Sequence, residues 1–141
     1  MENNPRNETT EPAPVAGPPA ESLPDAVDWD VLNGLREYQA EGEPDLVQEL
    51  VGMYRAETPG LLADIRAAMA AGEADKLRHA AHSLKGSSNN LGVRQVAALS
   101  AEIEKKGRSG TVEGVDALLA QLEREFERAA QALDAVLRGE A

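Results

Sequence analysis

Apolar residues recur along this chain at intervals of three and four positions, the spacing that places them on one side of a helix. Five segments follow this pattern, at about residues 28–39, 44–72, 73–89, 93–106 and 112–137. No stretch alternates between apolar and polar residues over a useful length, so no strand is predicted. Four long helices with short links favour an all-α fold, an antiparallel four-helix bundle with a short additional N-terminal helix.

Capping and breaking residues predict where these helices begin and end. Asp28 is suited to cap the first helix, and Pro44 to occupy the first turn of the second. Pro59 interrupts a pattern that is helical on both sides, which predicts one long helix with a kink rather than two elements. Gly72 is expected to end that helix, and residues 107–110 are expected to form a later turn.

Residues 1–26 have the composition of a disordered tail. They contain six of the chain's eight prolines and few side chains that a core would bury. We therefore divide the chain into a tail, residues 1–26, and a helical bundle, residues 27–139. Leu and Ala must fill most of the core, because aromatic residues make up only 3% of the chain and apolar residues 42%.

The net charge of −11, from 25 acidic and 14 basic residues, limits the partners of the chain. Nucleic acid and anionic membrane surfaces are recognised through Lys and Arg, so neither is an expected partner.

The absence of cysteine excludes disulfides and zinc–thiolate sites. No apolar run reaches the ~18 residues of a membrane span and no secretory signal is present, so we expect a cytoplasmic protein, and a monomer.

The third predicted helix carries the candidate chemistry. On a helical wheel with about 100° per residue, one side forms a stripe that is expected to be buried. This stripe comprises Leu77, Ala80, Ala81, Leu84 and Ser88. His82, Gly86, His79 and Asn89 lie on the opposite side, and Lys85 lies between the two. The imidazole of His82 is therefore predicted to point away from the core.

Gly86 lies one helical turn beyond His82, where glycine costs about 1 kcal/mol relative to alanine. One explanation is that the missing side chain leaves the imidazole open to a bulky partner; close packing by another helix is the alternative. Lys85 lies within reach of the same ring, where its ammonium would balance a phosphoryl dianion. An exposed neutral imidazole is a competent nucleophile near neutral pH.

The surroundings of His82 differ in charge from the remainder of the chain. Residues 73–110 contain seven basic and four acidic residues, a net charge of +3, which leaves −14 for all other residues. Such a basic region suits an anion or an acidic protein partner. His79 and His82 form only half of a zinc site, and no further His or Cys completes it, so no metal is expected. Ser87 and Ser88 lack the base that a nucleophilic serine needs.

The sequence His-Ser-Leu-Lys-Gly-Ser at residues 82–87, followed by Asn-Leu-Gly at 90–92, resembles the signature of histidine-containing phosphotransfer (HPt) domains. Two alanines directly before it and the segment 99–110 also resemble that family. The resemblance covers about residues 28–137 and leaves out the tail. It implies an antiparallel four-helix bundle with a short extra helix.

The same resemblance implies a function and a site. His82 would be phosphorylated at Nε2, Lys85 would assist, Gly86 would give access, and Ser87 completes the supporting motif. The implied partners are response-regulator receiver domains, whose aspartyl phosphate exchanges with the histidine, and a hybrid histidine kinase. We expect a phosphorelay intermediate and not an enzyme, since no Walker or kinase glycine loop is present. No cofactor is expected on this chain, and Mg²⁺ is expected on the receiver.

The docking surface is expected to centre on the third helix, where Arg78, His79 and Asn89 flank His82. The family pattern assigns no role to His79. The apolar part of the contact is expected from the helix that starts near Glu43 or from the short first helix, and the sequence leaves that choice open. Two other interpretations also stay open: a helical adaptor that no longer carries phosphate, and the phosphotransfer domain of a larger kinase.

Overall fold

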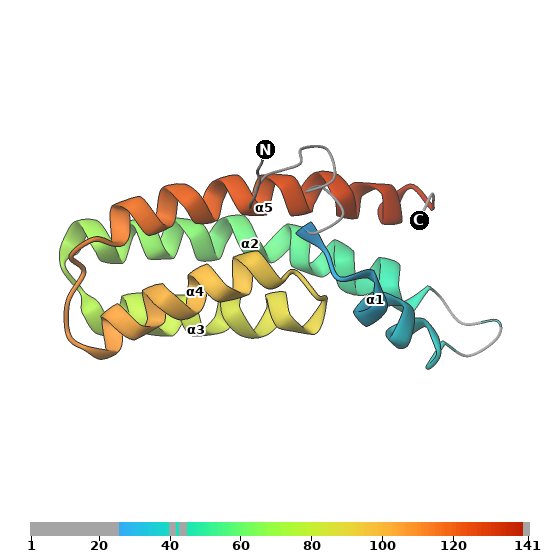
Figure 1. Ribbon diagram of the computed structural model, residues 1–141, viewed down its shortest axis with the longest axis horizontal. Helices are drawn as coiled ribbons and strands as arrows, with labels where there is room; N and C mark the ends of the chain where they lie inside the picture. Colours follow the sequence, from blue (N-terminus) through green and yellow to red (C-terminus); the bar gives the residue numbers. More distant parts are fainter. Residues whose placement is uncertain (1–25, 40–41, 43–44, 140–141) are drawn as a thin grey trace, which may run out of the picture.

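The computed structural model describes residues 26–39, 42 and 45–139, and this part of the chain contains five helices and no strand (Figure 1). The helices are α1 (Trp29–Arg36), α2 (Leu46–Ala71), α3 (Ala74–Asn90), α4 (Arg94–Arg108) and α5 (Val115–Leu137). The four long helices run alternately in opposite directions, with α2 and α4 each packed against both α3 and α5. The predicted antiparallel four-helix bundle is confirmed, and α1 is the short additional helix beside the start of α2.

The first helix begins where the sequence predicted and ends earlier. Asp28 caps α1, because its carboxylate accepts a hydrogen bond from the backbone N–H of Asp30. The helix ends at Arg36 rather than at about Gln39. The side chain of Gln39 instead accepts a hydrogen bond of 2.5 Å from the backbone N–H of Leu46, so this residue serves the start of the next helix.

The second helix begins later than predicted and then runs without interruption. Asp45 caps α2 and the helix starts at Leu46, so the predicted start at Pro44 is wrong. Pro44 itself lies outside the described residues. One helix continues through Pro59, as predicted, and the kink expected there stays a prediction. Gly72 ends the helix in the left-handed conformation, with φ of +70°, which confirms its predicted role.

Two predicted boundaries in the C-terminal half are wrong. α4 continues through Gly107 to Arg108, where a turn beginning at Gly107 was expected. The reason is packing: a Cβ on Gly107 would lie only 2.7 Å from the backbone carbonyl oxygen of Ala74, so this glycine permits close contact between α4 and α3. α5 begins at Val115 rather than at about residue 112, after Gly114 with φ of +79°.

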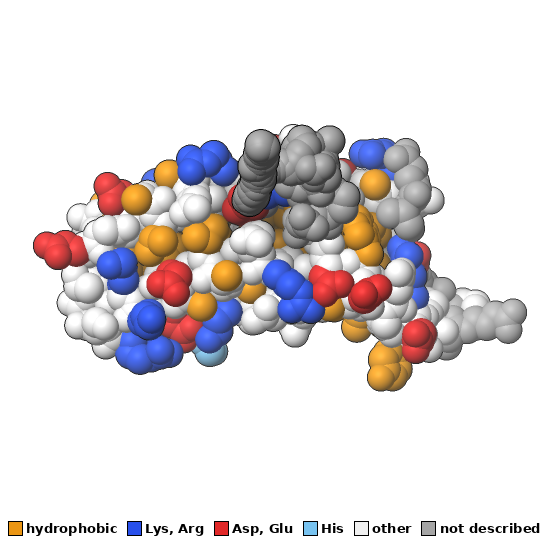
Figure 2. Space-filling model, viewed as in Figure 1, with side chains coloured by type: hydrophobic (Ala, Val, Ile, Leu, Met, Phe, Trp, Pro, Cys, Tyr) orange, Lys and Arg blue, Asp and Glu red, His pale blue; other side chains and the backbone are white. Residues whose placement is uncertain are grey.

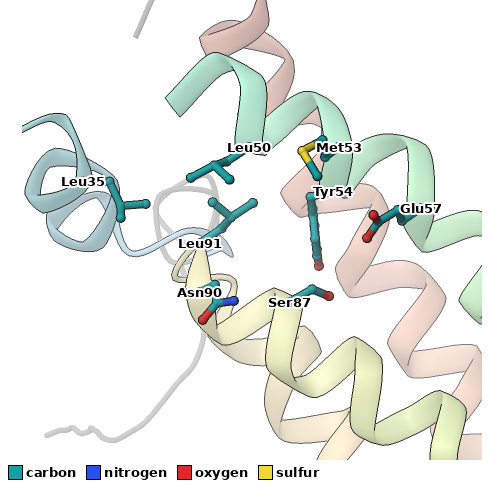
Figure 3. Close-up of a pocket in the computed structure, with 8 residues that line it drawn as sticks. All are labelled: Leu35, Leu50, Met53, Tyr54, Glu57, Ser87, Asn90 and Leu91. Atoms are coloured by element: carbon teal, nitrogen blue, oxygen red, sulfur yellow. The ribbon is translucent and has the colours of Figure 1, made fainter. Parts of the chain in front are cut away.

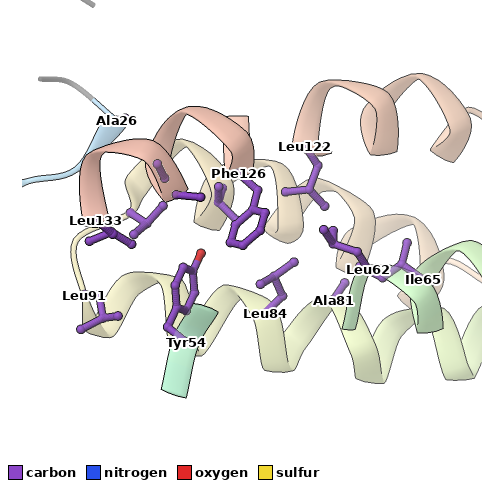
Figure 4. Packing of buried hydrophobic residues seen from close by; sticks show 14 of the residues in the cluster. Ala26, Tyr54, Leu62, Ile65, Ala81, Leu84, Leu91, Leu122, Phe126 and Leu133 are labelled. Carbon is purple, nitrogen blue, oxygen red and sulfur yellow. The ribbon is translucent and has the colours of Figure 1, made fainter. Parts of the chain in front are cut away.

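The core lies between the four long helices (Figure 4). Leu and Ala fill much of it, as the composition predicted, but Val, which that prediction left out, contributes as many buried side chains as Ala. Its aromatic pair is Tyr54 and Phe126, whose rings meet edge to face with centroids 5.8 Å apart. The Tyr54 hydroxyl shares a hydrogen bond of 2.8 Å with the buried Ser88 hydroxyl. Burial raises the pKa of Tyr54 to about 12. Ser88 thus joins α3 to α2 within the core.

Asp28 also ties α1 to the connection between α3 and α4. Its carboxylate accepts hydrogen bonds of 2.9 and 2.6 Å from the Arg94 guanidinium, which lowers the pKa of Asp28. Its backbone N–H donates to the carbonyl of Gly92 at 2.7 Å. Ala26 and Val27 are buried, so Ala26 belongs with the packed chain and not with the tail, which is a correction of the predicted boundary.

The remainder of the predicted tail, residues 1–25, lies outside the described residues, and its disorder stays a prediction. Among the described helices, none combines the length and the apolar composition needed to cross a membrane. The longest, α2, has 26 residues and carries charged side chains along its length.

Candidate functional site

The faces of α3 are those that the helical wheel predicted. The predicted stripe is buried in full: Leu77, Ala80, Ala81, Leu84 and Ser88. On the other side, the side chain of His82 is 64% exposed. Gly86, one turn further, is also exposed, and a Cβ placed on it would meet no heavy atom of a neighbouring helix within 4 Å. The described part of the chain therefore gives no support to close helix packing as the reason for Gly86.

A carboxylate from α4, that of Glu104, lies beside the imidazole of His82. The distance between Nδ1 of His82 and Oε2 of Glu104 is 2.8 Å. The Glu104 side chain is only 3% exposed, whereas the imidazole is largely accessible to solvent. One ring nitrogen is thus held by a group at the edge of the core, and most of the ring remains free for an incoming molecule.

Glu104 is held as an anion. The pKa of Glu104 is lowered, and the largest cause is the hydrogen bond from the Lys85 ammonium, which lies 2.8 Å from Oε1. His82 lowers that pKa further, whereas burial acts in the opposite direction. An ionised carboxylate can only accept hydrogen bonds, so Nδ1 of His82 is the donor. In the neutral ring the lone pair then lies on Nε2, which is the nucleophilic nitrogen.

Arg108 brings a second cation to the same carboxylate. Its guanidinium is 2.9 Å from Oε2 of Glu104, the oxygen that also accepts from His82. The Arg108 side chain is 63% exposed and has further N–H groups available, while that of Lys85 is 31% exposed. Figure 2 shows Lys and Arg side chains gathered around a histidine at the α3–α4 edge of the molecule.

Glu104 and Arg108 were not among the predicted site residues. Glu104 lies on the inner side of α4, together with Val96, Ser100 and Gly107, at spacings of three and four residues. An acidic residue inside an otherwise apolar or small-residue stripe is the signal that points to it, because a buried carboxylate needs partners. The close approach of Gly107 to α3 holds α4 near enough for Glu104 to contact His82.

Ser87 is not brought into contact with His82. Its hydroxyl donates a hydrogen bond of 3.3 Å to the carbonyl of Leu84, and the side chain lines hollows between α2 and α3. The motif residues therefore divide into two sets. Lys85 points toward α4 and the Glu104 carboxylate, and Ser87 points toward α2.

The predicted docking residues are all on α3 and occupy different surroundings. Arg78 pairs with Asp75 at 2.9 Å, and Nδ1 of His79 is 2.9 Å from the Asp75 carbonyl oxygen. Asn89 is exposed and lines a shallow hollow of about 240 Å³ between α3 and α4, together with Lys85. Arg78 and His79 thus precede His82 along the helix, and Asn89 follows it.

The described residues contain no group of three or more His, Cys, Asp or Glu side chains arranged to hold a metal ion. The expected lack of a metal or cofactor on this chain stays a prediction.

Comparisons with known proteins place this geometry in context. Residues 49–132 match the protein-family model described as Hpt domain. The crystal structure of histidine-containing phosphotransfer protein B (HptB) from Pseudomonas aeruginosa PAO1 is similar, with 32% identity, a TM-score of 0.74, and coverage of 80% of this chain and 95% of that chain. The HPT domain of the Hpt sensor hybrid histidine kinase from Shewanella shares the fold, with 22% identity, a TM-score of 0.68, and coverage of 82% and 96%. No curated protein matches the chain.

Proposed function

Because the chain belongs to the Hpt domain family, which acts in histidine phosphotransfer in two-component phosphorelays, we propose that His82 accepts a phosphoryl group at Nε2. The donor would be the aspartyl phosphate of a receiver domain, and the acceptor another receiver domain. The observation that carries the proposal is the hydrogen bond from Nδ1 of His82 to Glu104, since it leaves the lone pair on Nε2 of an exposed ring. Gly86, with no side chain one turn away, leaves room for the donor.

The transfer step needs little covalent chemistry from this chain. The Nε2 lone pair attacks the phosphorus of the aspartyl phosphate, and the bond from phosphorus to the aspartate oxygen breaks with its electron pair returning to the carboxylate. The ring becomes positively charged as the nitrogen–phosphorus bond forms, and Nδ1 keeps its proton. Glu104, 2.8 Å away, stabilises that positive charge. The reverse step uses the same atoms, so transfer runs in either direction.

Lys85 and Arg108 supply positive charge for the transferred group. Each forms one contact with Glu104, and each has further N–H donors for phosphoryl oxygens. Glu104 therefore has two roles in this proposal: it orients His82, and it holds the two cations beside it. A single buried carboxylate preorganises the charges that transfer requires.

Hpt domains are phosphocarriers rather than kinases. We propose the same for this chain, with no ATP site and no cofactor of its own, and with Mg²⁺ supplied by the receiver domain during transfer. The partners we propose are receiver domains and a hybrid histidine kinase. The monomeric state and the cytoplasmic location stay predictions.

The docking face of a receiver would centre on α3, around His82. Arg78, His79 and Asn89 flank the histidine along the helix, and the basic character of this region suits the acidic pocket of a receiver. Association is expected to weaken as salt rises, mainly through a slower on-rate, because exposed charges are screened beyond about 8 Å at physiological ionic strength.

The proposed function is tested by incubating the chain with a phosphorylated receiver domain and measuring acid-labile, base-stable phosphate on the chain. Wild-type protein should be labelled, and His82→Gln should not be, while its circular dichroism and melting temperature stay those of the wild type because the side chain is exposed. His79→Gln, at the chain's other histidine, is the matched control: it should still be labelled, at most more slowly, because His79 lies on the proposed docking face and does not carry the phosphate. Labelling of His82→Gln would refute the assignment. A wild type that binds the receiver but takes up no phosphate would favour the adaptor interpretation instead.

A further inference from the structure

Ser100, on the inner side of α4, has a buried hydroxyl that makes no hydrogen bond. Among the residues that the structure describes, its Oγ is the only buried side-chain polar atom without a partner. The other hydroxyls of the core are paired. Tyr54, whose hydroxyl points from α2 toward α3 (Figure 3), shares its hydrogen bond with Ser88, and Thr58 donates to the carbonyl of Tyr54 at 2.7 Å. A buried hydroxyl without a partner destabilises a fold, so the serine at position 100 needs an explanation.

Ser100 lies one helical turn before Glu104 on the same side of α4. Side chains four residues apart on a helix have Cβ atoms about 5–6 Å apart, so the hydroxyl is within side-chain reach of the Glu104 carboxylate. Arg108, one turn beyond Glu104, contacts Oε2. Lys85, the partner of Oε1, approaches from the other direction, because its side chain lines a hollow with Ala101, the neighbour of Ser100. These contacts place Oε1 on the side of Ser100 and Oε2 on the side of Arg108.

The partner of Oε1 is expected to change when His82 is phosphorylated. In the unphosphorylated chain the Lys85 ammonium, 2.8 Å from Oε1, satisfies this oxygen, and Ser100 is not needed. A phosphoryl group brings about 1.5 to 2 negative charges near neutral pH, against the single charge of Glu104, so it attracts the ammonium away from the carboxylate. Because the Glu104 side chain is buried, water does not replace the ammonium, and a buried carboxylate that loses a partner is costly.

We propose that Ser100 is a positioning residue: when Lys85 turns to a phosphoryl group on His82, the Ser100 hydroxyl donates a hydrogen bond to Oε1 of Glu104 in place of the ammonium. This inference rests on the proposed function. The exchange moves hydrogen bonds only, and no covalent bond forms or breaks. Glu104 stays ionised, and its Oε2 keeps the hydrogen bond from Nδ1 of His82. The phosphorylated ring therefore keeps its Nδ1 proton, and it leaves as a neutral imidazole when the phosphoryl group passes to the next receiver.

Removal of Lys85 imitates its departure from Oε1 and requires no phosphate. In the wild-type chain, Ser100→Ala should leave the melting temperature unchanged or higher, because it deletes an unsatisfied hydroxyl and alanine is the better helix former. In Lys85→Met, the same substitution should lower the melting temperature by about 4 °C, because Oε1 then loses its remaining donor. The expected result is thus a change of sign between the two backgrounds. An effect of the same sign in both, or no effect in either, would overturn the proposal.

Two controls tie this change of sign to the Glu104 carboxylate. Ser88 is also a buried serine, but its partner is Tyr54, so Ser88→Ala should lower the melting temperature equally with and without Lys85. Glu104→Gln removes the charge that needs donors. In that background, Ser100→Ala should have the same effect on the melting temperature whether or not Lys85 is present. A change of sign that persists in Glu104→Gln would assign the partner of Ser100 elsewhere and overturn the proposal.

The transfer equilibrium tests the same hydrogen bond in the phosphorylated chain. The probe is a receiver domain that accepts phosphate from the wild-type chain, mixed with chain that phosphoramidate has labelled. Ser100→Ala should shift the ratio of phosphorylated receiver to phosphorylated chain about fivefold toward the receiver, as expected for the loss of one hydrogen bond from the phosphorylated chain. In Glu104→Gln, Ser100→Ala should cause no further shift. A purely structural role for Ser100 would leave the ratio unchanged, and that result would also overturn the proposal.

Labelling by phosphoramidate, a small donor that needs no partner protein, separates this inference from the proposed function. Absence of labelling at His82 in the wild type would contradict the proposed function itself. Normal labelling at His82, together with the same sign of the Ser100→Ala effect in both backgrounds, would overturn the role of Ser100 and leave the proposed function intact.

Discussion

Gly86 of α3 and Gly107 of α4 are both inside helices, where glycine costs about 1 kcal/mol relative to alanine. Their surroundings are opposite. A Cβ on Gly86 would meet no neighbouring atom within 4 Å, whereas a Cβ on Gly107 would lie 2.7 Å from the Ala74 carbonyl oxygen and 2.9 Å from the Cβ of Arg78. Gly86 leaves open space on the surface of the bundle, whereas Gly107 lies where α3 and α4 are too close together for a side chain to fit.

The difference between the two glycines shows how the site is built. Close contact at Gly107 holds α4 against α3 less than one turn from Glu104, so the carboxylate is held at a fixed distance from the imidazole. The open position at Gly86 leaves the same imidazole accessible from outside. A rigid inner side and an unobstructed outer side are together what the phosphotransfer proposed for His82 requires.

The largest effect is expected for Gly107→Ala. The new methyl group meets backbone atoms that cannot rotate away, and overpacking of this kind costs about 1–3 kcal/mol. We expect a cost near the upper end of that range. The gain in helix propensity offsets part of this cost, so the net loss in the free energy of unfolding should be about 2 kcal/mol. Denaturant titration measures it. Gly86→Ala is the control and should gain up to about 1 kcal/mol; a change of the same sign in both variants would contradict the comparison.

The next largest effect concerns access to the histidine. Gly86→Gln should lower the rate of phosphotransfer from a receiver by about tenfold, because the side chain would crowd the approach to His82, as expected for a misplaced reacting group. Its melting temperature should be equal to or above that of the wild type, because glycine is the poorer helix former. Transfer rate and melting temperature should be measured on one sample. Unchanged transfer would mean that the open position at Gly86 has no bearing on the reaction.

The inner side of the site is probed by Glu104→Gln. The amide oxygen can still accept a hydrogen bond from Nδ1 of His82, but the loss of the negative charge weakens a charge-assisted contact by about 1 kcal/mol, so transfer should fall about fivefold. Glu102→Gln, an exposed position on the same helix, is the matched control. Equal rates for both variants would remove Glu104 from the proposed mechanism.

The dependence on pH follows from the lowered pKa of Glu104. A carboxylate whose pKa is lower in the folded state contributes stability above its ordinary value of 4.5 and loses that contribution as the pH falls through the folded-state pKa. Wild type should therefore be more stable than Glu104→Gln at neutral pH, and the difference should shrink on acidification below pH 4.5. Thermal melts of both proteins over a pH series measure this. A constant difference would show that the charge of Glu104 is not what stabilises the fold.

The smallest effect is expected from deletion of residues 1–25. This segment has few apolar side chains to pack on the bundle, so thermal stability and transfer should stay nearly those of the full chain. Ala26 should be kept, because it is buried. A clear loss of stability on deletion would show that the tail packs against the helices.

Periodicity predicts the faces of one helix well, because the turn angle alone decides which side a residue occupies. For α3 it predicted both the buried stripe and the exposed side with His82. The contact from His82 to Glu104 depends instead on how far α4 is rotated and shifted against α3, which no pattern within α3 encodes. Gly107 was interpreted as a turn because glycine often ends helices, whereas its surroundings in three dimensions make it a contact between helices.

The anchoring of α1 by Asp28 has an optical consequence. The chain has a single tryptophan, Trp29, and it is the first residue of α1, half-buried and packed against the core. Its fluorescence therefore reports on the attachment of α1 more directly than on the bundle, and Leu35 of the same helix lines a hollow that α1 shares with α2 and α3. A change in emission on mixing with a receiver, ahead of any transfer of phosphate, would let docking be timed separately from chemistry without a label.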